Sequence, residues 1–78
     1  MIKVCDKVIL AGVENEYNCS AVTGKAILIE ADKGCHTELK PFIWLPVSQF
    51  TYKCFDEAAQ AHVIIVSDWF MRNGIKIF

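Results

Sequence analysis

The residue types best suited to metal or nucleophilic chemistry in this sequence are cysteine and histidine, and their spacing forms no standard site. The cysteines are at positions 5, 19, 35 and 54, and none belongs to a Cys-x-x-Cys pair, the usual half of a structural zinc site. The nearest approach to a set of zinc ligands is Cys35, His36, Cys54 and His62. Because nothing in their spacing brings them together, we expect no metal and no cofactor, with Cys5 and Cys54 as small core residues and the other cysteines in loops.

Covalent and acid–base catalysis are not indicated either. A nucleophilic cysteine needs a base that points at its sulfur, and adjacent side chains such as Cys35 and His36 do not easily converge on one atom. Two pairs of carboxylates lie in stretches with the composition of solvated loops, namely Glu14 with Glu16 and Asp56 with Glu57. The sequence therefore predicts a protein that is not an enzyme.

Four aromatic residues have the character of a stacking platform for nucleic-acid bases, namely Phe42, Trp44, Phe50 and Tyr52, and a small barrel would use Phe42, Trp44 and Tyr52 for stacking. Binding driven by phosphates normally needs clustered Lys and Arg. Here the eight cationic residues are spread along the chain and the net charge is −1. We therefore favour core packing for these aromatics and do not expect direct nucleic-acid binding, while a small barrel that binds single-stranded nucleic acid stays as an alternative function.

Length and composition indicate one domain with a partner. A chain of 78 residues is too short to divide its buried surface between two cores, so residues 1–78 form a single domain. Apolar residues make up 54%, more than so small a domain can hide, which predicts an exposed patch, a protein partner or a homodimer. The longest uncharged run, 41–52, is too short for a membrane span. With no secretory pattern at the N-terminus, we expect a cytoplasmic protein.

Five stretches have strand composition, and together they predict a mainly β fold. They cover residues 2–13, 26–29, 42–45, 49–54 and 62–66. The stretches 26–29 and 42–45 are apolar on both alternating faces, which predicts strands covered on both sides. The strand at 26–29 is expected to be central, and the two are expected to form a hairpin with a long tip. The fourth alternates polar and apolar residues, so one of its faces is expected to be buried.

The remaining segments predict connectors and one short helix. Residues 14–24 have turn composition and are expected to be a connector, with extension of the preceding strand as the alternative for its first part. Residues 56–60 are expected to form a single helical turn. Ser67 is placed to cap a helix over residues 68–72, which ends at Asn73-Gly74 and which the packing of Trp69 and Phe70 must hold. The expected fold is α+β, a small strongly bent sheet or partly open barrel of about five strands with one short C-terminal helix.

Three segments carry a resemblance that covers nearly the whole chain. They are TGKAILIE at 23–30, WLPVSQF at 44–50, and VSDWF at 66–70 with its continuation to 74–75. The chain resembles a family of small phage and prophage proteins of unknown function, whose shared pattern is a Lys-Ala-aliphatic-Leu strand followed by a Trp-aliphatic-Pro-x-Ser-Gln segment. The hairpin tip at 31–41 is longer than this pattern usually allows, and its Cys35-His36 has no counterpart there.

The resemblance implies a phage-type protein that acts in the bacterial host cytoplasm. By analogy, it implies a non-enzymatic inhibitor that binds a host defence complex such as a CRISPR effector, in the manner of an anti-CRISPR protein. A self-associating structural or regulatory subunit, with residues 75–78 as an intermolecular edge, is a further alternative. The expected partner-binding residues lie in segments that should be irregular and exposed: Glu14, Glu16, Tyr17, Asp32, Lys33, His36, Glu38, Asp56 and Glu57.

Overall fold

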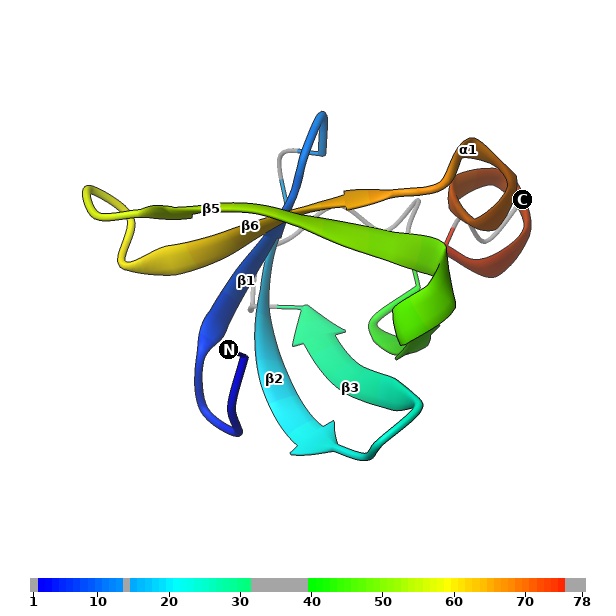
Figure 1. The fold of residues 1–78 in the computed structure, drawn as a ribbon, viewed down its shortest axis with the longest axis horizontal. Coiled ribbons are helices and arrows are strands. Elements are labelled where there is room, and N and C mark those ends of the chain that lie inside the picture. Colours follow the sequence, from blue (N-terminus) through cyan, green and yellow to red (C-terminus); the bar gives the residue numbers. More distant parts are fainter. Residues whose placement is uncertain (1, 14, 32–39, 76–78) are drawn as a thin grey trace.

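The computed structural model describes residues 2–13, 15–31 and 40–75, which form a six-stranded sheet (Figure 1). Its strands are β1 (Lys7–Leu10), β2 (Glu16–Val22), β3 (Ala26–Ala31), β4 (Phe42–Pro46), β5 (Phe50–Asp56) and β6 (Ala61–Val66). They lie in the order β4-β3-β2-β1-β6-β5. Only β1 and β6 pair in parallel. The predicted mainly β class with one short C-terminal helix is confirmed, with six strands where the sequence indicated five.

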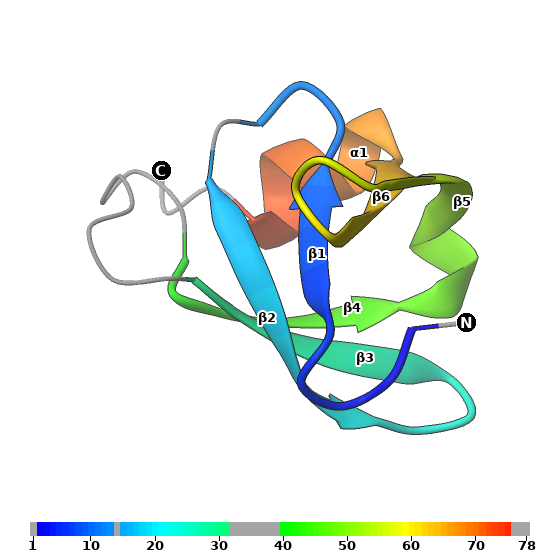
Figure 2. The same ribbon diagram turned by 90° about the vertical axis from the view of Figure 1, so that its left-hand side faces the viewer.

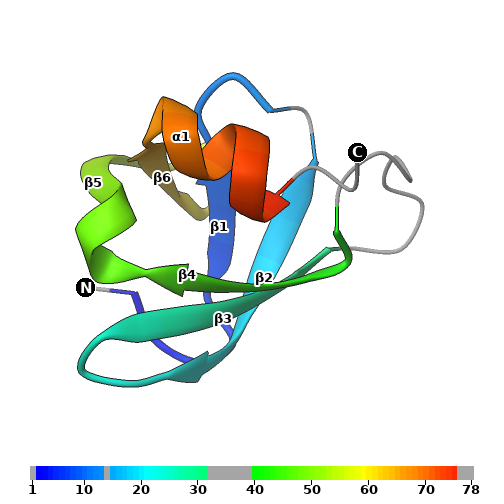
Figure 3. The ribbon, with the colours of Figure 1, turned by 90° about the vertical axis from the view of Figure 1, so that its right-hand side faces the viewer.

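The sheet bends because its two edge strands are neighbours in the chain. β4 and β5 lie at opposite edges, but only the 3₁₀ turn η1 (Val47–Gln49) separates them. The edges therefore have to meet at this corner, and the sheet curls, as Figures 2 and 3 show. The N–H of Val47 donates to the carbonyl of Lys25 at 2.8 Å and holds the corner to the start of β3. β4 and β5 do not pair with each other, so the sheet stays open.

The inner face of the curled sheet carries the hydrophobic core. Side chains that alternate with exposed or half-exposed ones turn inward from β1 to β4 and from β6, as the period of two requires. Burying each of these aliphatic side chains contributes about 1.5–3 kcal/mol to folding. The fully buried side chains include Val8, Leu10, Tyr17, Ile29, Leu45, Ile64 and Ile75.

The C-terminal helical segment closes one side of this core (Figures 1 and 3). Ser67 caps α1 (Asp68–Phe70) as predicted, and its Oγ accepts the N–H of Phe70 at 3.2 Å. The helix continues as a single π-helical turn, η2 (Met71–Ile75), which carries Ile75 into the core. Trp69 was expected to pack but is 61% exposed, because the core-facing side of this short segment is occupied by Phe70, Met71 and Ile75. Among the described helices, none is long and apolar enough to cross a membrane.

The connector expected at 14–24 is wrong, because most of it is β2. Tyr17 and Cys19 point into the core, and the neighbours Glu16 and Asn18 are half-exposed. The polar residues that suggested a turn are therefore the outer face of a half-buried strand. The strand expected over 2–13 is also too long, since β1 spans only Lys7–Leu10.

Both edge strands are more exposed than the sequence indicates. Phe42 and Trp44 are 60% and 53% exposed, so β4 is covered on one side only and the expected cover on both sides is wrong. On β5, Tyr52 is 39% exposed and Cys54 is also exposed, so the expected buried face is limited to the start of that strand. The register shifts between Tyr52 and Cys54, and residues 57–60 form a turn rather than helix.

The segment before β1 contains a strained turn that gives a stability prediction. The N–H of Asp6 donates to the carbonyl of Lys3 at 3.0 Å, which closes a four-residue turn with Cys5 in its third position. Cys5 has a φ of 78°, a value that favours glycine at this position of a type II turn. The N–H of Cys5 in turn donates to the carbonyl of Cys19 at 2.8 Å, so this conformation is fixed by β2.

Replacing Cys5 by glycine is therefore expected to stabilise the protein. Relief of the left-handed strain is worth about 1–2 kcal/mol, and the greater backbone entropy of unfolded glycine costs about 0.5–1 kcal/mol. The middle of both ranges leaves a net gain of roughly 0.7 kcal/mol. Urea denaturation measures it. Cys5→Ser is the matched control, since it also removes the thiol but keeps the strain, and an equal gain in both variants would contradict this explanation.

Candidate functional site

Of the partner-binding residues expected from the sequence, the structure describes Glu16, Tyr17, Asp56 and Glu57. Glu16 lies on β2, with its Oε1 3.4 Å from Nζ of Lys7. Asp56 ends β5, where its Oδ1 accepts the N–H groups of Ala58 and Ala59 at 3.0 and 3.2 Å and so shapes the following turn. The residues of the expected set that lie outside the described ranges are Glu14, Asp32, Lys33, His36 and Glu38.

Two members of that set have clear and opposite environments. Glu57 is exposed in the turn after β5, as expected. Tyr17 is fully buried, so the expectation that it is exposed in an irregular segment is wrong. It faces the core because it belongs to the inward-pointing residues of β2. Tyr17 is therefore no longer a candidate for direct contact with a partner.

The three cysteines that the structure describes occupy the reverse of their expected places. Cys5 and Cys54 are exposed, whereas Cys19 is buried in β2. Burial raises the pKa of the Cys19 thiol, and its Sγ–H donates to the carbonyl of Ala21 at 3.5 Å. It is a core residue and stays protonated. The described residues hold no group of three or more side chains suited to a metal ion, and Cys35 and His36 lie outside them.

A chain of hydrogen bonds joins three separate elements around His62. Nδ1 of His62 is 2.8 Å from the hydroxyl of Tyr52 on β5, and Nε2 is 2.9 Å from Oδ2 of Asp6 in the turn before β1. The ring of Phe55 packs edge-to-face with the imidazole of His62, with the two ring centroids 5.1 Å apart. In neutral His62 this pattern is satisfied when Nε2–H donates to Asp6 and Nδ1 accepts from Tyr52. Both ring nitrogens are thus occupied, and the chain ties β5, β6 and the N-terminal turn together.

Asp6 is the charged end of this chain, and its environment gives a pH prediction. The backbone N–H of Lys3 donates to its Oδ2 at 2.9 Å, and this bond, followed by the one from His62, lowers the pKa of the Asp6 carboxyl. A lowered folded-state pKa contributes stability above the unfolded value of about 4, and this stability is lost as the pH falls through the folded value.

The Asp6→Asn variant is accordingly expected to be less stable than the parent at pH 7. The difference in the free energy of unfolding between the two proteins should shrink as the pH falls from about 4 towards 2, because the parent carboxylate then becomes protonated and uncharged, like the Asn side chain. Urea midpoints measured across this range test the prediction. A gap that is the same at pH 7 and pH 3 would assign the effect to something other than the charge of Asp6.

Four of the nine large exposed hydrophobic residues in the described part of the chain lie on the two edge strands, β4 and β5. Phe42 and Trp44 alternate with the buried Ile43 and Leu45, so both aromatic rings stand on the outer face of β4. Trp44 lies opposite Leu28 of β3 in the strand register. Aromatic rings with more than half of their surface in water stabilise the fold little. Exposed apolar patches on a protein surface mark interaction sites. The other two on edge strands are Tyr52 and Phe55 of β5, and the remaining five are Val4, Val22, Val47, Ile65 and Trp69.

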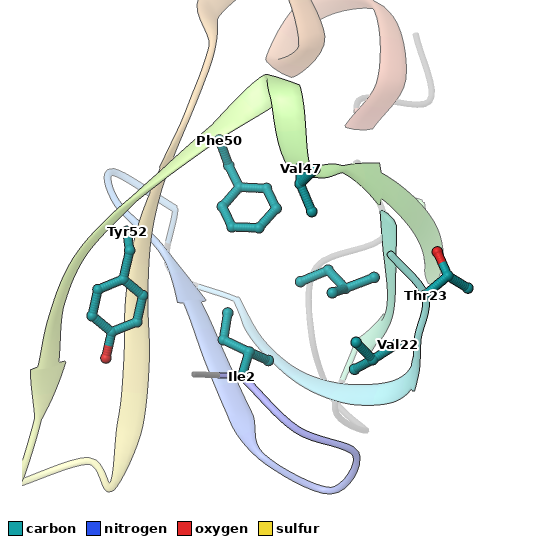
Figure 4. Close-up of a pocket in the computed structure, with 7 residues that line it drawn as sticks. Ile2, Val22, Thr23, Val47, Phe50 and Tyr52 are labelled. Carbon is teal, nitrogen blue, oxygen red and sulfur yellow. The ribbon is translucent and has the colours of Figure 1, made fainter. Parts of the chain in front are cut away.

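A separate apolar pocket opens between β5 and the turn that joins β2 to β3 (Figure 4). Its volume is about 310 Å³. It exists because the sheet is open where β5 leaves the corner at η1. Ile27 contributes from β3, and the six side chains labelled in Figure 4 are Ile2, Val22, Thr23, Val47, Phe50 and Tyr52.

The polar groups of the pocket are already engaged. Oγ1 of Thr23 donates to the carbonyl of Ala26 and accepts the N–H groups of Lys25 and Ala26, all within 3.3 Å. The Tyr52 hydroxyl is bonded to His62. The pocket therefore offers an apolar surface rather than free hydrogen-bonding groups.

The three aromatic rings named for the nucleic-acid alternative lie in two different environments. Phe42 and Trp44 stand on the outer face of β4, whereas Tyr52 lies opposite the buried Ile64 on β6 and lines the pocket. The three rings proposed to stack bases thus belong to different faces of the sheet.

Sequence reasoning missed the pocket, because its lining comes from three separate stretches of the chain that only the tertiary fold brings together. The one local signal was Val47, an aliphatic residue directly after Pro46 in a segment too irregular for a strand. Comparison with known proteins adds no further residues: no protein-family model, curated protein or solved structure matches this chain.

Proposed function

We propose that this protein is a non-enzymatic, phage-type protein that binds a host defence complex and inhibits it, in the manner of an anti-CRISPR protein. The observation that carries the proposal is the exposed aromatic pair on β4, Phe42 and Trp44, at 60% and 53% exposure. Aromatic residues are the side chains on which protein interfaces most depend. The resemblance of the sequence to small phage proteins supports the host and the class of target.

The charge of the protein also favours a protein target over nucleic acid. The net charge is −1, and neutralisation of several phosphates would need a cluster of cations. An apolar contact surface instead predicts binding that changes little between low and moderate salt. Such binding needs no reaction at the surface, in agreement with a stoichiometric inhibitor.

The test is phage plating on a panel of bacterial strains that each carry one active CRISPR system directed against the phage. Expression of the protein is expected to restore plaques on at least one strain. The Phe42→Ser/Trp44→Ser double variant is expected to lose this effect, because both rings are removed from the interface while the core is untouched. Ile65→Ser is the control, since Ile65 is 48% exposed but lies on β6.

Plating that the protein leaves unchanged on every strain would contradict the proposal for the CRISPR systems in the panel. Affinity capture from the same strains then separates the remaining possibilities. Recovery of a different host complex would keep a protein-binding function with another target, and recovery of the protein alone, together with dimeric elution on gel filtration, would indicate a self-associating subunit.

A further inference from the structure

We infer that the pocket between β5 and the β2–β3 turn is a docking site for an acidic segment of a protein partner, which inserts one large apolar side chain. This inference rests on the proposed function and names the chemistry of the partner. It concerns a surface distinct from the aromatic pair on β4, and none of the partner-binding residues expected from the sequence lines it.

The size of the pocket sets the size of the inserted group. Its volume of about 310 Å³ is roughly twice that of an engineered 150 Å³ cavity known to hold benzene. The pocket therefore has room for a side chain as large as an indole. Its aromatic and aliphatic lining, from residues such as Phe50, Ile27 and Val47, would be buried by that group, and removal of this surface from water supplies the driving force.

The shape of the pocket favours a side chain presented by a protein over a free small molecule. Its walls are exposed, with Val22 at 46%, Val47 at 45% and Tyr52 at 39%. A site for a small molecule normally encloses 70–90% of its ligand. A protein surface, by contrast, covers the walls around its own inserted side chain and so excludes water from an open pocket.

The charge around the pocket favours an acidic partner. The lining comes from Ile2 and from residues 22–27 and 47–52. The charged residues within these positions or directly next to them are three exposed lysines, with no Asp or Glu. The lysines are Lys3, Lys25 and Lys53, and within the described part of the chain none is in an ion pair. In a protein with a net charge of −1, this is a local excess of positive charge. Carboxylates that flank the inserted side chain would complement it and speed association.

The test is titration of the purified ¹⁵N-labelled protein with three short, end-blocked peptides, followed by NMR. The peptides are Glu-Asp-Trp-Glu-Asp, the same peptide with alanine in place of tryptophan, and Lys-Lys-Trp-Lys-Lys. The first is expected to shift the amide signals of the pocket residues and to bind at least about tenfold more tightly than the other two, a difference of ~1.4 kcal/mol.

Matched variants locate the site. Val47→Asp places a charge in the pocket wall at an exposed position and is expected to weaken the acidic tryptophan peptide about tenfold or more. Lys25→Gln should weaken it about two- to fivefold, as for an exposed ion pair. Ile65→Asp, on β6, should leave its affinity unchanged. Equal binding of the tryptophan and alanine peptides, shifts confined to β4, or free indole binding as tightly as the peptide would each overturn the inference.

This titration uses no host component, so its failure is distinct from failure of the proposed function. The Val47→Asp variant in the plating assay links the two. If the parent protein restores plaques and Val47→Asp does so equally, the inhibitor proposal stands and the pocket inference is overturned. If Val47→Asp loses both peptide binding and plaque restoration while the parent and Ile65→Asp keep both, the pocket is the docking site for the target.

Discussion

The Tyr17→Ala variant is expected to be largely unfolded at 37 °C. Tyr17 is fully buried among the inward-facing residues of β2, and truncation of a buried aromatic ring costs about 3–5 kcal/mol because it loses both burial and packing. A domain of this size has a total stability of about 4–12 kcal/mol. The expected loss is therefore a large part of the whole, and circular dichroism on heating should show a much lower midpoint.

Glu16→Ala is the matched control, because Glu16 is the neighbour on the same strand and is half-exposed. Its pairing with Lys7 is a surface ion pair, for which a loss of at most about 1 kcal/mol is expected. The two variants together decide whether Tyr17 serves folding or binding. A Tyr17→Ala protein that keeps the parent stability but loses its partner would restore the side chain to the binding surface.

Replacement of Ile75 by alanine is expected to destabilise the protein by about 2–5 kcal/mol. Ile75 is fully buried, and it is the residue through which η2 completes the core. Urea denaturation at constant slope gives the loss directly. If the C-terminal segment were instead an intermolecular edge, as one interpretation of the sequence suggested, the substitution would change the elution volume on gel filtration and leave the stability of the monomer nearly intact.

Trp69→Ala provides the comparison within the same segment. Trp69 is much larger than Ile75 but is 61% exposed, so its removal should cost less than about 1 kcal/mol. The informative result is that Ile75→Ala lowers the stability more than Trp69→Ala, since a ranking by side-chain size alone predicts the opposite. A larger loss for Trp69→Ala would mean that α1 packs through its tryptophan after all.

The parts of the fold that the sequence predicts well are those with local causes. The aliphatic run at 26–29 formed β3, and Ser67 caps α1 because its side chain needs only an N–H three residues later. The strand β2 was missed although its residues alternate, because Asn18 and Ser20 have the composition of a turn. There the period of two was a better guide than composition.

The parts that were not predicted depend on contacts between distant segments. The residues near Trp44 in the sequence do not predict that the outer face of β4 is exposed, because this depends on whether a distant segment packs against it. The bond between His62 and Asp6 joins residues 56 positions apart. The lining of the pocket comes from Ile2 near the start of the chain and from residues 22–27 and 47–52, so no local pattern could have assembled it.

The parallel pairing of β1 with β6 has a consequence for the order in which the protein folds. Strands β1 to β4 are joined to their neighbours in sequence and can pair as they leave the ribosome, but Lys7 of β1 has to wait for Ala61. Until then one backbone edge in the middle of the final sheet is unpaired. Closure of so long a loop places the protein among slowly folding β topologies, on a scale of milliseconds to seconds.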